Sequence, residues 1–182
     1  MSSSSLYLPD LGELVELFYS SVAECGALSP ADGEAIPAGY RLLLAHTAHM
    51  TVTLEAYHRS LVDVKVLERQ VTPTHYARKI TLTRQSDGAV VMFGIMRVNL
   101  TVLDPEVQER IVGEGTPLGR ILIEHDILRR IRTPRLWRIL PGADLAACMQ
   151  LESPRVTYGR TAMMNLNEAP AVELLEIVTP LS

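Results

Sequence analysis

The chain has 182 residues, of which 47% are hydrophobic and 21% are charged, and its formal net charge is −4 at pH 7. This length and apolar content predict one compact domain over residues 1–182 and exclude a disordered protein, and the acidic balance disfavours a nucleic-acid binder. No apolar run approaches the roughly 18 residues of a membrane span, and the serine-rich start lacks the basic segment of a secretory signal. Cys25 and Cys148 are far apart and predict thiols of a reducing, cytoplasmic compartment.

The N-terminal part is predicted to be mainly helical. Residues 1–9 are expected to be disordered. One amphipathic helix is expected from Asp10, which can cap its start, to Gly26. A loop rich in proline and glycine follows, and then a second helix from Tyr40 to about His46.

The remainder is predicted to consist mainly of strands. The segment after Met50 is ambiguous, because its apolar residues fit either a strand or one helical face. A hairpin turn is expected at residues 86–88. Alternating apolar residues predict strands over 62–66, 75–85, 89–99, 127–140, 155–166 and 171–178, with short helices after Asp104 and over 118–123. Helices first and strands later favour an α+β fold on a single antiparallel sheet.

Three charged side chains share their strand face with apolar residues. Arg78, Arg160 and Glu176 are all predicted to point inward, where an unpaired charge is costly. Two interpretations remain open. Glu176 can form a structural ion pair with an arginine, or the three groups can line an anion pocket in which the glutamate is a general acid. Glu173 is an alternative acid, because the opposite face of its strand is also apolar.

Several segments resemble chorismate pyruvate-lyases, the enzymes that make 4-hydroxybenzoate. Residues 115–120, GTPLGR, are similar to their G-x-TPLGR segment. Residues 76–80 resemble the strand that carries their essential arginine, and residues 158–160 with Glu176 resemble their closing hairpin. The segment from Met50 is similar to a helix near their pocket, which favours a helix here. The resemblance covers about residue 42 to the C-terminus.

The resemblance implies about six antiparallel strands with helices packed on them around an internal ligand cavity. It also implies a carbon–oxygen lyase that removes pyruvate from chorismate, with no metal and no cofactor. Glu176 and Arg78 would be catalytic. The expected substrate-binding residues are Arg78, Leu118, Gly119, Arg160 and Met50.

Two alternatives accompany this interpretation. Gly94-Ile95 stands where the enzymes have Gly-Arg, so the chain can be a divergent lyase that acts on a related acid. The superfamily also includes ligand-binding domains of transcription regulators, which makes a non-catalytic domain for a small aromatic acid the second alternative. The N-terminal helices are too short for a winged helix. The expected partner is therefore a small molecule and not a nucleic acid, bound by a monomer or a small homo-oligomer.

Other clusters have simpler interpretations. His46, His49 and His58 lack a convincing further metal ligand and are expected to be structural or surface residues, with His49 near the cavity mouth. The arginines of residues 129–138 are expected to form a solvated face. Flexible core or cavity-wall residues are expected at Met92, Met96, Met163 and Met164.

Overall fold

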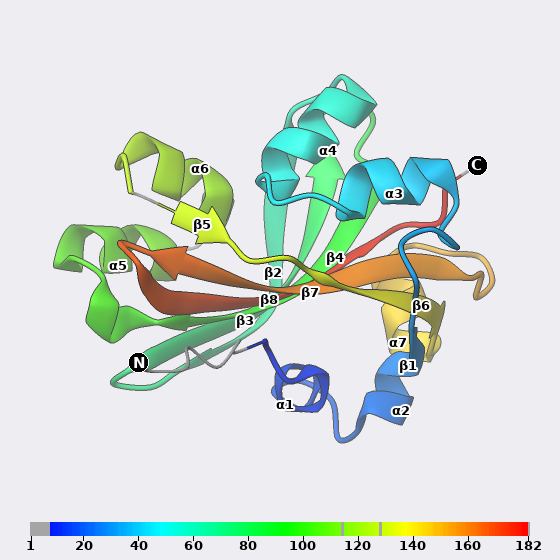
Figure 1. Cartoon of the computed structure of the whole chain (residues 1–182), viewed down its shortest axis with the longest axis horizontal. Helices are drawn as coiled ribbons and strands as arrows, with labels where there is room; N and C mark the ends of the chain where they lie inside the picture. Colours follow the sequence, from blue (N-terminus) through cyan, green and yellow to red (C-terminus); the bar gives the residue numbers. More distant parts are fainter. Residues whose placement is uncertain (1–7, 114, 128, 182) are drawn as a thin grey trace.

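The computed structural model describes residues 8–113, 115–127 and 129–181 (Figure 1). Its strands are β1 (Gly26–Pro30), β2 (Val62–Val71), β3 (His75–Arg84), β4 (Val90–Asn99), β5 (Arg129–Ile131), β6 (Arg135–Pro141), β7 (Thr157–Leu166) and β8 (Ala169–Val178). Its helices are α1 (Leu11–Val15), α2 (Val22–Cys25), α3 (Ala38–Leu44), α4 (Met50–His58), α5 (Pro105–Val112), α6 (Leu118–Glu124) and α7 (Ala143–Cys148), with a 3₁₀ turn, η1 (Leu100–Val102).

One antiparallel sheet organises the described residues. Its strand order is β1-β6-β7-β8-β4-β3-β2, and β5 pairs with β7. The predicted α+β class on a single antiparallel sheet is confirmed, but the sheet has eight strands and not about six. Tight turns give the sheet its hairpins. Gly88 after β3 has a φ of 72°, and Asn167 and Glu168 between β7 and β8 have φ values of 47° and 71°, as in the turns that suit hairpins.

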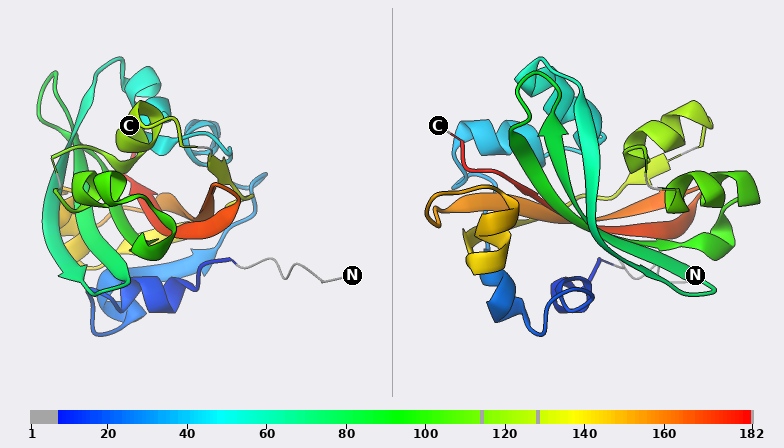
Figure 2. Two further views of the ribbon diagram at one scale, coloured as in Figure 1. Left: turned by 90° about the vertical axis from the view of Figure 1, so that its left-hand side faces the viewer. Right: turned by 180° about the vertical axis from the view of Figure 1, so that it is seen from behind.

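The two faces of the sheet are covered by different helices (Figures 1 and 2). On one face, α3 to α6 pack over β3, β4, β7 and β8 in two adjoining apolar clusters. On the other face, α1, α2 and α7 pack over β4, β6 and β8 in a third cluster. We call these the cavity face and the back face. No helix in the described ranges is long and apolar enough to cross a membrane.

The N-terminal helix prediction is wrong in its length. Asp10 caps α1 as expected, because its side chain accepts a hydrogen bond from the Glu13 N–H at 2.9 Å. However, Ser21 caps a separate helix, α2, and the Glu24 carboxylate reaches back to the Ser20 N–H at 2.8 Å. This second capping arrangement starts a new helix where one continuous helix was predicted. Residues 1–7 of the segment expected to be disordered lie outside the described residues, and Pro9 is buried.

Two further elements were not predicted. β1 is a five-residue edge strand that pairs with β6 inside the stretch expected to be a loop. α7 follows β6 directly and packs on the back face. The ambiguous segment after Met50 is the helix α4.

Candidate functional site

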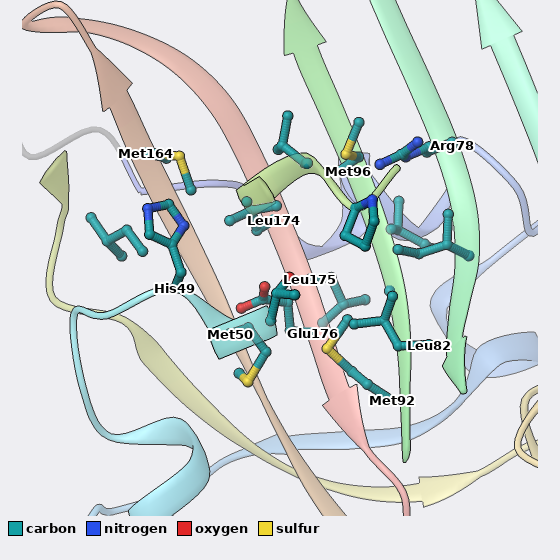
Figure 3. A pocket seen from close by; sticks show the side chains of 18 residues that line it. His49, Met50, Arg78, Leu82, Met92, Met96, Met164, Leu174, Leu175 and Glu176 are labelled. Carbon is teal, nitrogen blue, oxygen red and sulfur yellow. The ribbon is translucent and has the colours of Figure 1, made fainter. Parts of the chain in front are cut away.

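A cavity of about 50 Å³ lies on the cavity face, between the sheet and the helices α4 and α6 (Figure 3). Its wall is mainly apolar and combines side chains of β3, β4, β5, β7 and β8 with those of the two helices. Its methionines are Met50, Met92, Met96 and Met164. A thioether side chain has three rotatable bonds, so a wall of this kind can change shape at low cost.

Arg78 places a cation in this wall. It is 0% exposed, and its guanidinium lies beside Met96 in Figure 3. The strand pairing explains its position, because Arg78 is aligned with Met96 of β4, which is aligned with Leu174 of β8. The predicted inward direction of Arg78 is therefore what the structure has. A buried guanidinium offers a planar fork of N–H donors that matches a carboxylate.

Glu176 lies in the same cavity but is held by Arg160. The pairing of β7 with β8 places the two residues opposite each other, and Arg160 Nε donates to Glu176 Oε2 at 2.7 Å. Arg160 Nη1 also donates to the backbone carbonyl of His46 at 2.7 Å. Of the two interpretations of the inward charges, the structural ion pair describes Arg160 and Glu176. Arg160 is not among the residues that line the cavity.

Glu173 lies away from the cavity. Its carboxylate accepts hydrogen bonds from Arg97 Nε at 2.5 Å and from Arg97 Nη2 at 2.9 Å. Glu176 and not Glu173 is thus the carboxylate that faces the cavity.

Gly94 lies on the floor of the cavity, between the two charged groups of the wall. It pairs with Ile80 on one side and with Glu176 on the other. A Cβ at Gly94 would lie 3.3 Å from Ile80 Cγ1 and from Met92 Cε, so the missing side chain allows these two side chains to pack closely against the strand there. Arg78 and Glu176 are two strands and two residues apart, which corresponds to a Cα separation of roughly 12 Å.

The segment that resembles the lyases forms the roof of the cavity. Pro117, Leu118 and Gly119 at the start of α6 line it, opposite Met50 of α4. A Cβ at Gly119 would lie 3.3 Å from His49 Nδ1. Of the predicted site residues, the structure brings Met50, Arg78, Leu118, Gly119 and Glu176 to one cavity and leaves Arg160 behind it.

His49 also lines this cavity, as expected for a residue near its mouth. Burial is the main cause that lowers the pKa of His49 to about 4, and the positive charges of Arg129 and Arg160 lower it further. The imidazole is therefore neutral at pH 7, and its Nε2 accepts a hydrogen bond from Arg129 Nε. Within the described ranges, no group of three or more His, Cys, Asp or Glu side chains is arranged to hold a metal ion.

The arginine-rich segment lies along β5 and β6. Arg130, Arg135 and Arg138 are exposed, as a solvated face requires. Trp137 is buried, and its Nε1–H donates to Thr161 at 3.1 Å.

Comparison with known proteins gives structural similarity only. No known protein family and no curated protein matches the chain by sequence. The crystal structure of PhnF from Mycobacterium smegmatis is similar with a TM-score of 0.57 at 13% identity, covering 73% of this chain and 64% of PhnF. This chain thus spans just under two thirds of that protein.

Two solved single domains are also similar. The effector domain of the same PhnF has a TM-score of 0.55 at 12% identity, covering 71% of this chain and 87% of that domain. The ligand-binding domain of a putative GntR-family transcriptional regulator from Bordetella bronchiseptica has a TM-score of 0.51 at 12% identity. The match covers 65% of this chain and 85% of that domain. At such identities the likeness establishes the fold alone, which is the predicted chorismate lyase-like fold with an internal cavity.

The predicted lyase activity is wrong. The predictions that followed from it, which were chorismate as substrate, pyruvate as product and a role in aromatic acid biosynthesis, are therefore also wrong. The similar structures include an effector domain and the ligand-binding domain of a transcriptional regulator. The catalytic roles expected of Glu176 and Arg78 depended on that activity. The resemblance in sequence agrees with the fold, which is what the similar structures establish.

Proposed function

We propose that this chain, taken as one domain over residues 1–182, is a non-catalytic binding domain for a small cyclic or aromatic carboxylic acid. The acid would occupy the cavity beneath α4 and α6. The observation that carries this proposal is the fully buried guanidinium of Arg78 in the wall of a mainly apolar cavity. The similar fold of an effector domain and of a ligand-binding domain supports it.

Arg78 would bind the carboxylate of the ligand. Its planar fork of N–H donors matches a carboxylate, which can accept two charge-assisted hydrogen bonds from it. Neutral molecules of the same shape form weaker hydrogen bonds with a guanidinium. The proposal therefore requires a strong preference for acids.

The rest of the cavity would bind the ring. Leu118 and Gly119 of α6 and Met50 of α4 would contact its faces from the roof. The Glu176 carboxylate would accept a hydrogen bond from a hydroxyl group on the far end of the ring. Arg160 would not touch the ligand and would hold this carboxylate in place.

A calorimetric titration tests the proposal. The ligands are benzoate, 4-hydroxybenzoate and cyclohexanecarboxylate, with benzamide as the neutral match of benzoate. We expect benzoate to bind about 10- to 100-fold more tightly than benzamide, as one charge-assisted contact predicts. If no acid binds, or if benzamide binds as tightly as benzoate, the proposal is wrong.

Substitution of Arg78 locates the binding site. The Arg78→Met variant should lose about 10- to 100-fold in benzoate affinity and none in benzamide affinity. Arg138→Met is the matched control, because Arg138 is an exposed arginine of β6. It should bind benzoate like the original chain. Equal losses in the two variants would place the acid outside this cavity.

A further inference from the structure

Two hollows of the molecule meet at His49 and Ile131. The inner one is the cavity described above, of about 50 Å³. The outer one, of about 400 Å³, is more open and is lined by Thr47, His49, Asp126, Ile127, Arg129 and Ile131. Because His49 and Ile131 line both, these two side chains separate the inner cavity from the outer pocket.

The inner cavity has to widen before it can hold a ring. Its volume has room for about one or two water molecules, whereas pockets for small organic ligands measure roughly 300–1,000 Å³. Backbone strands of the sheet are fixed by their hydrogen-bonded neighbours, so the moving parts are side chains. The methionines can change the shape of the inner wall, and the wall toward the outer pocket includes His49.

His49 is held in place from two sides. On one side Gly119 of α6 leaves the ring its space, because a Cβ at Gly119 would lie 3.3 Å from Nδ1. On the other side Arg129 Nε donates to Nε2. His49 precedes the first residue of α4, and its side chain makes no capping hydrogen bond to that helix. The ring is thus free of a helical role and is kept in the wall by Arg129.

The outer pocket is lined by a cation, Arg129, and an anion, Asp126. Arg129 belongs to a segment with five arginines and no acidic residue between positions 129 and 138. Arg129 itself lines the outer pocket beside Asp126, and its Nη1 donates to the carbonyl of Ile127 at 3.3 Å. A carboxylate that enters this pocket meets a guanidinium whose Nε–H is engaged by His49. A ligand carboxylate that binds the Arg129 guanidinium would compete with the His49 ring for it and would thereby release the ring.

We propose that the outer pocket is the entrance for the anionic ligand and that the His49 side chain, held by Arg129, is the gate between this entrance and the inner cavity. The inference rests on the proposed function, since it concerns the path of the same ligand. The carboxylate pairs first with Arg129, the bond from Arg129 to His49 breaks, and the ring turns aside. The acid then passes to Arg78 and the ring returns.

The experiment measures access to the inner cavity and needs no ligand. Met96, next to Arg78 in Figure 3, is changed to cysteine, and the protein is treated with two methanethiosulfonates of similar size. One carries a sulfonate anion and the other a trimethylammonium cation. The cysteine thiolate attacks the reagent, a mixed disulfide forms and methanesulfinate leaves. Peptide mass spectrometry gives the labelling rate at each cysteine. Cys25 and Cys148 pack on the back face and serve as internal references.

Three added substitutions separate the gate from general loosening. His49→Ala should raise the labelling rate of the Met96→Cys variant about tenfold with both reagents, because the barrier to entry falls. Arg129→Gln should raise the rate with the cation and lower the anion-to-cation rate ratio, because it releases the ring and removes the attraction. Arg130→Gln, an exposed neighbour, should change neither. The rates at Cys25 and Cys148 should stay constant.

Several results would overturn the gate. They are an unchanged rate in His49→Ala, an equal effect of Arg130→Gln, or labelling of the parent variant as fast as that of a small thiol in solution. Met164→Cys, at another point of the same cavity wall, repeats the measurement if Met96→Cys does not fold. Failure of every acid to bind in calorimetry contradicts the proposed function, whereas failure of these rates to respond contradicts the gate alone.

Discussion

Arg78 and Lys79 are consecutive residues of β3, and both are almost completely buried, with exposures of 0% and 4%. They point to opposite faces of the sheet and meet different surroundings. On the back face, Lys79 Nζ lies 2.5 Å from Glu68 and 3.3 Å from Asp144, and 4.8 Å from the centre of the Tyr19 ring. On the cavity face, Arg78 borders a hollow. The back face uses its buried cation to attach helices, and we infer that the cavity face uses its own to bind a ligand.

The largest effect on stability is expected at the ion pair between Arg160 and Glu176, on the cavity face. Arg160→Met leaves the Glu176 carboxylate buried without its partner and removes a donor from the His46 carbonyl. We expect a loss of about 3–5 kcal/mol in the free energy of unfolding, measured by urea denaturation. Arg160→Met combined with Glu176→Gln should recover part of that loss. If the single variant is as stable as the original chain, the ion pair has no structural role.

The next largest effect is expected on the back face. Lys79→Met should cost about 2 kcal/mol of unfolding free energy, because Asp144 and Glu68 lose their cation while both remain half exposed to water. Thermal unfolding of this variant beside the original chain measures the loss. A Lys79→Met variant as stable as the original chain would contradict a structural role for the buried cation of the back face.

The smallest effect concerns the loss of stability at low pH. The pH range of that loss should differ between the two faces of the sheet. His49 has a folded pKa of about 4 against an ordinary value of 6.5, mainly because of burial. The unfolded chain therefore binds this proton first, and stability falls as the pH is lowered from about 6.5 to about 4. His49→Gln should reduce the fall by about 1 kcal/mol. It should not abolish the fall, because burial also lowers the pKa of His46 and of His58.

The contribution of the back face to stability should be lost only at lower pH. Burial alone would raise the pKa of Asp144, but the Tyr19 hydroxyl and the Lys79 ammonium outweigh it and hold this pKa below its ordinary value of 3.8. The stabilisation by Asp144 is thus complete above pH 3.8 and is lost as the pH falls below it. Urea denaturation at a series of pH values distinguishes the two ranges. A slope between pH 6.5 and 4 that is unchanged in His49→Gln would contradict the assignment to the cavity face.

The sequence predicted the directions of side chains on the strands better than it predicted which side chains contact each other. Alternation along the strands correctly predicted that Arg78, Arg160 and Glu176 face inward, because successive residues of a strand point to opposite faces. It could not tell that Arg160 and Glu176 lie opposite each other, because that depends on the pairing of β7 with β8. The contact between His49 and Arg129 joins residues 80 positions apart, and no local pattern encodes it.

The error about activity has a similar origin. Residues 115–120 and the order of the elements are properties of a fold, and Leu118 and Gly119 of this segment line the cavity. Whether a carboxylate in such a cavity acts on a ligand or holds an arginine depends on contacts made across the sheet. The missed elements are the least patterned ones. β1 is short and lies at an edge, and α7 is held mainly by its packing on the back face.

The adjacency of Arg78 and Lys79 makes β3 sensitive to a shift of one position. Because side chains alternate between the faces, such a shift would put the lysine in the hollow and the arginine among the back-face carboxylates. The chain would still bury two cations, yet a compact ammonium would replace the planar fork that recognises an acid. The irregular pairing of β3 with β4 between Leu82 and Thr83, next to the turn at Gly88, fixes the alignment of the strand. The alignment of β3 with its neighbours thus decides which of the two cations borders the hollow.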